Sequence, residues 1–240
     1  MKRKREDWVE VWEVIRKIRE IRDAPVDLLG CDKLADKGEP EEVYNFQVLV
    51  AAMLSSQTRD QKTAEAMASL KAKPGGLSIE SVLSSTDLEI GNAIRGVSFH
   101  NTKAKHIRQA ACVLKNEHDS KLPRTLPELL KFPGVGPKMA NLVLHCAFNQ
   151  NDGIVVDTHV HRICSLLGWG CKVCDSCSKP EHTRVALEQW LPRELWAEFT
   201  VTLVGLGQLL QSEKGRLADK CSKCDNPDEA LKLMKRLGLK

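Results

Sequence analysis

The sequence contains no apolar run near the roughly 20 residues that cross a bilayer, although 42% of its 240 residues are hydrophobic. It also carries little excess charge, since 36 Lys and Arg against 32 Asp and Glu give a net +4. That balance permits a polyanionic partner without requiring one. We expect a soluble globular chain that does not enter a membrane, long enough for one large domain or two small ones.

No apolar secretory leader accompanies the nine cysteines. This combination indicates a reducing compartment, where spaced cysteines bind metal more often than they form disulfides. Four isolated cysteines are expected to be small buried hydrophobic residues. These four are Cys31, Cys112, Cys146 and Cys164. The basic run Lys2–Arg5, followed by acidic residues, fits a solvated end, a nuclear address or a phosphate-contacting arm.

Alternating strand patterns are missing too, and helical periodicity predicts an all-α fold. The one β-like run, Ile154–Val156, is too short to found a sheet. Tyr44–Leu54 and Gln61–Leu70 carry apolar residues at helical spacing. Capping boxes, in which Ser or Thr precedes an acid by three residues, predict three helix starts. The pairs are Thr86 with Glu89, Thr125 with Glu128, and Ser178 with Glu181.

The segment Leu126–Phe148 predicts a helix-hairpin-helix: a short helix, a tight turn over 132–137, and a second helix from about Lys138. Glycines in the turn permit positive φ and close approach to a ligand. The first N–H groups of the second helix lack internal partners and suit a phosphate. A plain turn between packed helices is the alternative. We expect Gly134, Val135 and Gly136 to hold backbone phosphate without reading base sequence.

Lys138 is a candidate nucleophile, because it starts the second helix, where the helix dipole favours acids rather than cations. A solvated side chain is the alternative. An amine must be neutral to attack, and a free lysine is neutral in only about one molecule per thousand near neutral pH. The dipole contributes roughly 0.3–1 kcal/mol, less than one pKa unit, so partial burial on DNA binding must supply the rest.

Asp157 is the candidate acid, within the segment Val155–Arg162. It stands at the predicted N-cap of a helix that runs to about Leu167, and Asp is among the best N-capping residues. An ordinary cap is therefore one interpretation. A capping role also fixes an ionised carboxylate, which can stabilise positive charge developing on a sugar, so one residue can serve both purposes.

The segments Phe132–Ala140 and Val156–Arg162 together resemble the endonuclease III family of bifunctional DNA glycosylase/AP lyases, in its eukaryotic branch. The segments Leu54–Asp60 and Gly96–Ala104 are similar to family segments as well, and the resemblance covers about Trp8 to Gly207. It implies two all-α lobes: a six-helix barrel over about 38–150, and a second lobe from 1–37 and 151–240.

The resemblance also implies roles for single residues. Lys138 matches the Schiff-base lysine that attacks C1′ of an extruded nucleotide, and Asp157 matches the carboxylate that assists it. Gln57 matches a glutamine that fills the hole in the duplex, although an ordinary polar residue at a helix start is the alternative. Lys103 and His159 are expected to contact DNA, with a structural role as the alternative for His159.

The implied activity is removal of oxidised pyrimidines from duplex DNA, followed by β-elimination on the 3′ side of the abasic site. The expected partner is double-stranded DNA carrying an oxidised pyrimidine or an abasic site. The chain is expected to be monomeric and to work in the nucleus, with a mitochondrial pool left open. The main alternative is a non-catalytic helix-hairpin-helix DNA-binding module, which leaves the pairing of Lys138 with Asp157 unexplained.

The chain departs from the family at its iron-sulfur loop, C-x6-C-x2-C-x5-C, of which it keeps only Cys221 and Cys224. Gln211 and Ala230 stand at the other two positions. Two thiolates cannot supply the four ligands of a [4Fe-4S] cluster, so we doubt the cluster. A replacement using Cys171, Cys174 and Cys177 is conceivable, and a degenerate loop is the alternative. No cofactor is needed for lysine chemistry.

Overall fold

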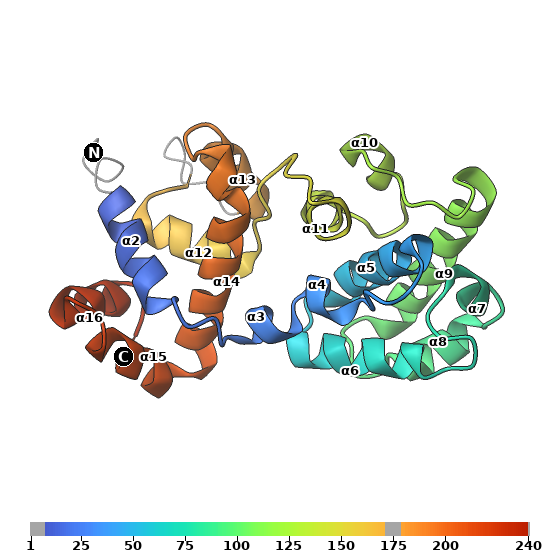
Figure 1. Cartoon of the computed structure of the whole chain (residues 1–240), viewed down its shortest axis with the longest axis horizontal. Coiled ribbons are helices and arrows are strands. Elements are labelled where there is room, and N and C mark those ends of the chain that lie inside the picture. Colours follow the sequence, from blue (N-terminus) through green and yellow to red (C-terminus); the bar gives the residue numbers. More distant parts are fainter. Residues whose placement is uncertain (1–7, 171–178, 240) are drawn as a thin grey trace. The chain divides into compact units, whose positions relative to one another are not determined.

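The computed structural model describes residues 8–170 and 179–239, and helices are its regular elements throughout this described part (Figure 1). It confirms the all-α prediction, and Ile154–Val156 is an extended segment outside any helix. Contacts between Cα atoms divide the chain into two units. We call Leu29–Asp152 the central unit, and the chain up to Leu28 together with Gly153 onward the terminal unit.

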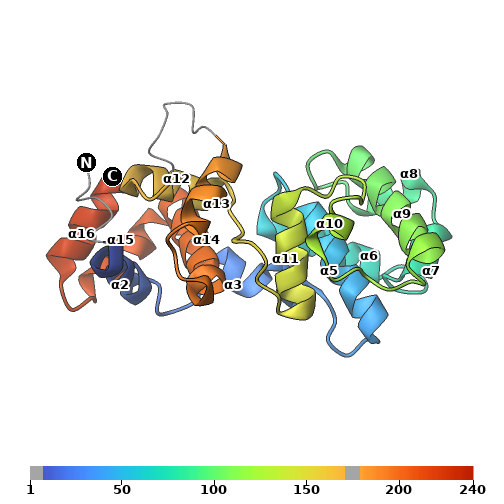
Figure 2. The ribbon, with the colours of Figure 1, turned by 90° about the horizontal axis from the view of Figure 1, so that it is seen from above.

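The central unit contains eight helices within the described residues. They are α4 (Cys31–Leu34), α5 (Glu41–Ser55), α6 (Asp60–Lys71), α7 (Ile79–Leu83), α8 (Asp87–Ala93), α9 (His100–Glu117), α10 (Leu126–Leu129) and α11 (Pro137–Phe148). Helix α5 is apolar around its circumference, and its residues Asn45–Leu54 are all buried. Such a helix belongs inside a domain, and α4, α6, α9 and α11 pack around it. Figure 2 shows the same helices from above.

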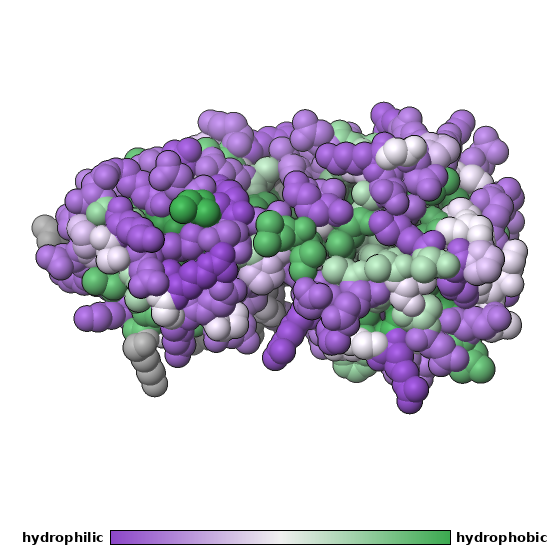
Figure 3. Space-filling model, turned by 60° about the horizontal axis from the view of Figure 1, so that its bottom comes forward, coloured by the Kyte–Doolittle hydropathy of each residue, from purple (hydrophilic) through white to green (hydrophobic). Residues whose placement is uncertain are grey.

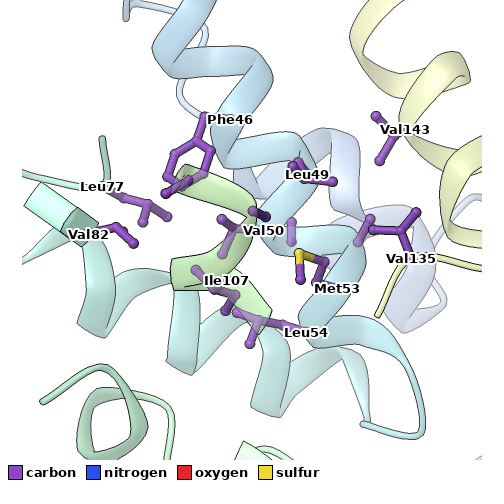
Figure 4. Packing of buried hydrophobic residues seen from close by; sticks show 14 of the residues in the cluster. Phe46, Leu49, Val50, Met53, Leu54, Leu77, Val82, Ile107, Val135 and Val143 are labelled. Carbon is purple, nitrogen blue, oxygen red and sulfur yellow. The ribbon is translucent and has the colours of Figure 1, made fainter. Parts of the chain in front are cut away.

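The core of the central unit reaches the segment between α10 and α11. Figure 4 shows Leu49, Met53 and Leu54 of α5 among side chains from neighbouring elements, including Val135. Val135 is 7% exposed and belongs to the same cluster of buried hydrophobic residues. The turn that the sequence predicts to hold phosphate is therefore anchored from below by an apolar side chain.

The terminal unit joins segments from both ends of the chain. Its helices are α2 (Trp8–Ile18), α12 (Thr158–Leu167), α13 (Pro180–Glu188), the 3-10 turn η1 (Arg193–Leu195), α14 (Trp196–Ser212), α15 (Lys214–Ser222) and α16 (Pro227–Arg236), while α3 (Pro25–Leu29) spans the boundary. Helix α14 is the apolar centre and packs against α2, α12 and α15. This unit has its own core, in which Trp12, Trp169 and Phe199 form a chain of ring contacts.

Local helix signals were predicted with mixed success. The capping box of Thr86 and Glu89 is confirmed, with both reciprocal hydrogen bonds formed. The box at Thr125 is wrong: α10 starts there, but the hydroxyl of Thr125 donates to the Glu128 carboxylate at 2.5 Å instead of accepting from a backbone amide. Ser178 lies outside the described residues.

The four isolated cysteines differ in burial. Cys31 and Cys164 are buried as predicted, whereas Cys112 and Cys146 are only half-buried. None of the helices in the described ranges is long and apolar enough to cross a membrane. Hydrophilic side chains predominate on the face shown in Figure 3.

Candidate active site

The hairpin between α10 and α11 is built on a reverse turn of four residues. The N–H of Val135 donates to the carbonyl of Phe132 at 3.1 Å, with Pro133 and Gly134 at the two central positions. Gly134 has φ +74°, in the left-handed region. Proline followed by a residue with positive φ is the arrangement of a type II turn, which favours glycine at the third position. The sequence Phe-Pro-Gly-Val therefore encodes the turn locally.

Packing beneath the turn holds it in place. Phe132 is 2% exposed, and the imidazole of His118 stacks on its ring with 5.7 Å between centroids. The imidazole of His106, on α9, lies directly against Gly134, so that a Cβ there would overlap its Nδ1. With Val135 buried as well, the hairpin backbone is supported from α5 and α9 and leaves its outer side free for a ligand.

Within the described part of the chain, the start of α11 has free space and no capping side chain. Gly136 is its N-cap, with φ −103°, and Pro137 opens the first turn. Among the described residues, no side chain caps this end and no acid lies in its first turn. Free N–H groups at the positive end of a helix dipole suit a phosphate oxygen. A Cβ on Gly136 would meet nothing within 4 Å, so space for a ligand is open at this glycine.

Lys138 is the second residue of α11 and is half-buried. Its positive charge acts on two groups of neighbouring elements. It helps to lower the pKa of Lys103 on α9, after the larger effect of desolvation. It also opposes the burial that raises the pKa of the Cys31 thiol, on α4, to about 11. The candidate nucleophile thus stands where α4, α9 and α11 converge within the central unit.

Gln57 lies in the loop that joins α5 to α6. It is exposed and has φ +53°, which is uncommon for a residue other than glycine, asparagine or aspartate. Around it the loop is closely bonded: the N–H of Thr58 donates to the carbonyl of Ser55 at 3.3 Å, and the hydroxyl of Thr58 donates to the carbonyl of Ser56 at 3.2 Å. The backbone therefore presents Gln57 outward from a fixed loop.

The side chain of Lys103, a predicted DNA contact, is directed into the protein toward the end of α5. The side chain is 8% exposed. Its ammonium donates to the carbonyls of Leu54 at 2.7 Å and Ser56 at 2.6 Å, and to the hydroxyl of Thr58 at 3.2 Å. Burial lowers its pKa to about 8. All three donors are engaged with the α5–α6 loop.

Phe99, within the segment Gly96–Ala104, is a further candidate for DNA contact to which the sequence pattern gives no role. It is 66% exposed and has φ +57°, directly before α9. Its carbonyl accepts from the N–H of Lys103 at 3.0 Å. An exposed aromatic side chain can stack on a base or enter between base steps. The exposed ring accompanies a left-handed backbone at Phe99. The residue type gives no signal of that backbone conformation.

Asp157 lies in the terminal unit, at the N-cap of α12 as predicted. Its Oδ1 accepts from the N–H of Val160 at 2.9 Å. The preceding extended segment is fixed on both sides, because the N–H of Ile154 donates to Glu188 at 3.0 Å and the carbonyl of Val155 accepts from the hydroxyl of Thr200 at 2.9 Å. The carboxylate is half-exposed and held by one backbone bond.

His159 packs tightly within the terminal unit. A Cβ on Gly207 of α14 would overlap the His159 side chain, so α12 and α14 approach closely at this point. The structure thus brings Gln57, Lys103, Lys138 and the hairpin into one unit, and Asp157 and His159 into the other.

The described residues do not fit a four-cysteine cluster. Cys221 is 0% exposed within α15, and burial raises the pKa of its thiol to about 11, which disfavours the thiolate that metals bind. The thiol of Cys224 donates to the carbonyl of Lys220 at 3.4 Å. Ala230 is fully buried in the same core. No three potential metal ligands gather in the part of the chain that the structure covers, and Cys171, Cys174 and Cys177 lie outside it.

Comparison with known proteins finds consistent relatives. Residues 50–193 match the model of the HhH-GPD superfamily of base excision DNA repair proteins. The chain is 45% identical to endonuclease III-like protein 1 of Gallus gallus, over 93% of this chain and 76% of that protein. It is 42% identical to the endonuclease III homolog of Schizosaccharomyces pombe, over 90% of this chain but only 60% of the relative.

Solved structures share the fold. A non-covalent endonuclease III–DNA complex superposes with a TM-score of 0.68 at 24% identity, covering 95% of both chains. A trapped covalent endonuclease III–DNA intermediate gives a TM-score of 0.67 at 22% identity, over 92% of this chain and 97% of that one. The matched residues include both Lys138 and Asp157.

Proposed function

Because the chain belongs to the endonuclease III branch of the HhH-GPD superfamily of base excision DNA repair proteins, we propose that it is a bifunctional DNA N-glycosylase and abasic-site lyase. Its substrate is duplex DNA that carries an oxidised pyrimidine or an abasic site. The observation that carries the proposal is the place of Lys138, half-buried one residue after the hairpin and at the uncapped start of α11. A hairpin that grips phosphate there holds the strand beside an amine.

The hairpin acts by position. The N–H groups that open α11 bind a backbone phosphate, and the open space at Gly136 allows the strand to approach. Such contacts fix the DNA without reading its sequence, which suits an enzyme that searches for damage. Gln57 and the exposed ring of Phe99 are presented by rigid loops of the same unit. We assign them to the space that an extruded nucleotide leaves in the duplex.

Lys138 performs the chemistry in two stages. Its neutral amine attacks C1′, the glycosidic bond breaks, and the base leaves with the bonding electrons and takes up a proton. The attached nitrogen gives up a proton, the C1′–O4′ bond then breaks, and O4′ takes up a proton, which leaves a protonated imine at C1′. The resulting imine acidifies C2′. Loss of a proton from C2′ then expels the 3′ phosphate through cleavage of the C3′–O bond, and water releases the sugar remnant from the lysine. No redox partner enters any of these steps.

Asp157 supplies the negative charge. In the first stage the sugar develops positive charge, and the carboxylate fixed at the N-cap of α12 stabilises it. Its single backbone bond leaves the other oxygen available to accept a proton from the attacking amine. Lys138 belongs to the central unit and Asp157 to the terminal unit.

The terminal unit is proposed to fold without a [4Fe-4S] cluster, since two thiols, one of them buried in an apolar core, do not suit it. We further propose that the chain acts as a monomer on nuclear DNA. Two plant relatives are named as chloroplastic, so the branch also includes organellar enzymes. Iron and zinc analysis of protein purified without a metal-affinity tag tests the first point, and stoichiometric metal would refute it.

Borohydride trapping tests the activity. The protein is incubated with duplex DNA containing thymine glycol, and borohydride is added to reduce any imine to a stable crosslink. We expect a crosslinked band with the unaltered protein and with the control Lys121→Ala, an exposed lysine of the same unit. We expect none with Lys138→Ala. A band that persists in Lys138→Ala would refute the assignment of the nucleophile. DNA binding without crosslinking or base release would favour the non-catalytic DNA-binding module.

A further inference from the structure

We propose that Lys103 is a positioning residue that caps the C-terminus of α5 and thereby holds Gln57 in its presented conformation. The inference rests on the proposed function, because it assigns Lys103 a part in filling the damaged duplex. The residue contacts the loop and no reacting atom. Its effect on activity therefore passes through Gln57.

The first argument is the chemistry of a helix end. The last carbonyls of a helix have no internal partners, and they form the negative end of its dipole. Helix α5 ends at Ser55. The ammonium of Lys103 donates hydrogen bonds to the carbonyls of Leu54 at 2.7 Å and Ser56 at 2.6 Å. A buried cation bonded to two such carbonyls satisfies both and is stabilised by the dipole.

The second argument is the position of the third hydrogen bond that the Lys103 ammonium donates. It reaches the hydroxyl of Thr58 at 3.2 Å, on the far side of Gln57 from the two carbonyls. One ammonium thus binds the backbone before Gln57 and the side chain after it. Gln57 between them has φ +53°, a conformation that costs an L-residue energy and persists only where its surroundings impose it. The three bonds of Lys103 provide that constraint.

The third argument connects a second loop. The backbone N–H of Lys103 donates to the carbonyl of Phe99, whose φ is also positive and whose ring is exposed. Lys103 therefore bonds to the loops of Gln57 and Phe99, two exposed residues with a left-handed backbone, one through its ammonium and the other through its backbone. Replacing its side chain releases the Gln57 loop and leaves the backbone bond to Phe99 intact.

The test compares two DNA substrates. Base excision from a thymine glycol duplex needs the Gln57 loop, whereas imine trapping on single-stranded DNA with an abasic site needs Lys138 but has no opposite strand to refill. We expect Lys103→Met to lower the single-turnover excision rate about 10- to 100-fold, as small displacements of positioning groups do. Single-strand trapping should fall much less than duplex excision, because it loses only the effect of the Lys103 charge on Lys138. Lys121→Met serves as the control for loss of a lysine, since that side chain is 68% exposed.

A double-mutant cycle identifies the route. If Lys103 acts through Gln57, adding Lys103→Met to Gln57→Ala should slow excision by no more than about threefold, because the shared effect is already lost. A 2-aminopurine base opposite the lesion reports insertion directly by fluorescence. Its signal on binding should fall in Lys103→Met. Multiplying effects in the cycle, or an unchanged excision rate and signal in the single variant, would refute the proposal.

Milder variants test the proposal even where Lys103→Met fails to fold. Thr58→Val removes one of the three acceptors, and Thr58→Ser restores it. We expect the valine variant to slow duplex excision about threefold with unaltered single-strand trapping, and the serine variant to match the unaltered protein. Equal rates for both variants would count against the proposal. If the unaltered protein traps no DNA at all, the proposed function has failed instead, and the two failures are distinguished.

Discussion

Substitution of the two hairpin glycines by alanine should have different effects on stability and DNA binding. Gly134 provides a left-handed backbone, and Gly136 leaves space for a ligand. Gly134 has φ +74° and the imidazole of His106 against it, whereas Gly136 has φ −103° and open space. An L-residue in the left-handed region costs about 1–2 kcal/mol. Displacing the half-buried imidazole adds to this. For a chain of this size, we expect Gly134→Ala to lower the melting temperature by roughly 2–8 °C.

Gly136→Ala should change the stability by less than about 1 kcal/mol, because alanine adopts this backbone without strain and restricts the unfolded chain, while it is a poorer N-cap than glycine. Its methyl group, however, would occupy the approach of a phosphate to the first N–H groups of α11. Its affinity for duplex DNA should therefore fall about tenfold, a loss of about 1.4 kcal/mol. Gly136→Ala should therefore lower mainly the affinity for DNA, whereas Gly134→Ala should lower both the melting temperature and the affinity.

The measurements are thermal melting by circular dichroism and fluorescence anisotropy with a labelled duplex. Repeating Gly134→Ala in a His106→Ala background removes the overlap with the imidazole and leaves the backbone strain. About half or less of the stability loss should then be recovered. A Gly134→Ala protein that melts and binds like the unaltered one would refute the left-handed turn. Equal destabilisation by both alanines would refute the distinction between the glycines.

Three further predictions concern stability. Gly205→Ala should destabilise the protein by about 3–5 kcal/mol in chemical denaturation. Its Cβ would overlap the fully buried guanidinium of Arg19 and break the ion pair of that group with Asp27 at 2.5 Å. A loss of stability below about 1 kcal/mol would contradict this prediction. Thr86→Ala should cost about 1 kcal/mol in the same assay by removing the capping box of α8, and no change would show that the box contributes nothing. Burial lowers the pKa of Lys103 to about 8, below the roughly 10.4 of an unfolded lysine, so between these values the unfolded state holds a proton that the native state has lost. The free energy of unfolding should therefore rise from pH 8 to pH 10, relative to Lys103→Met, by up to about 1.4 kcal/mol per pH unit, and parallel pH profiles for the two proteins would contradict the burial of a charged amine.

Features encoded by neighbouring residues could be predicted from the sequence. The turn at Pro133 and Gly134 follows from the φ preferences of those two residues, and the N-cap at Asp157 follows from a short acceptor before a helical pattern. The Thr125 box failed because its hydroxyl and the Glu128 carboxylate satisfy each other. A spacing pattern cannot distinguish that arrangement from a bond to the backbone.

Features that depend on distant contacts could not be predicted in this way. A DNA contact for Lys103 was expected from the resemblance of its segment to the family, and a resemblance does not give the direction of a side chain. Its direction is decided by the end of α5, some 48 residues earlier in the chain, whose free carbonyls attract its ammonium. Likewise, nothing in the residue types of Gln57 or Phe99 indicates a positive φ. Tertiary contacts impose both conformations.

The C-terminal segment has a physical means of staying ordered with only two of the four cysteines. Helices α15 and α16 pack on each other and on α2, and their buried side chains Leu217, Leu233 and Met234 each contribute about 1.5–3 kcal/mol through burial. Cys221 is part of this apolar surface. In this structure the thiol of Cys221 would have to leave the apolar core to reach a metal, which would open a cavity. Hydrophobic packing therefore holds α15 and α16 to the core of the terminal unit.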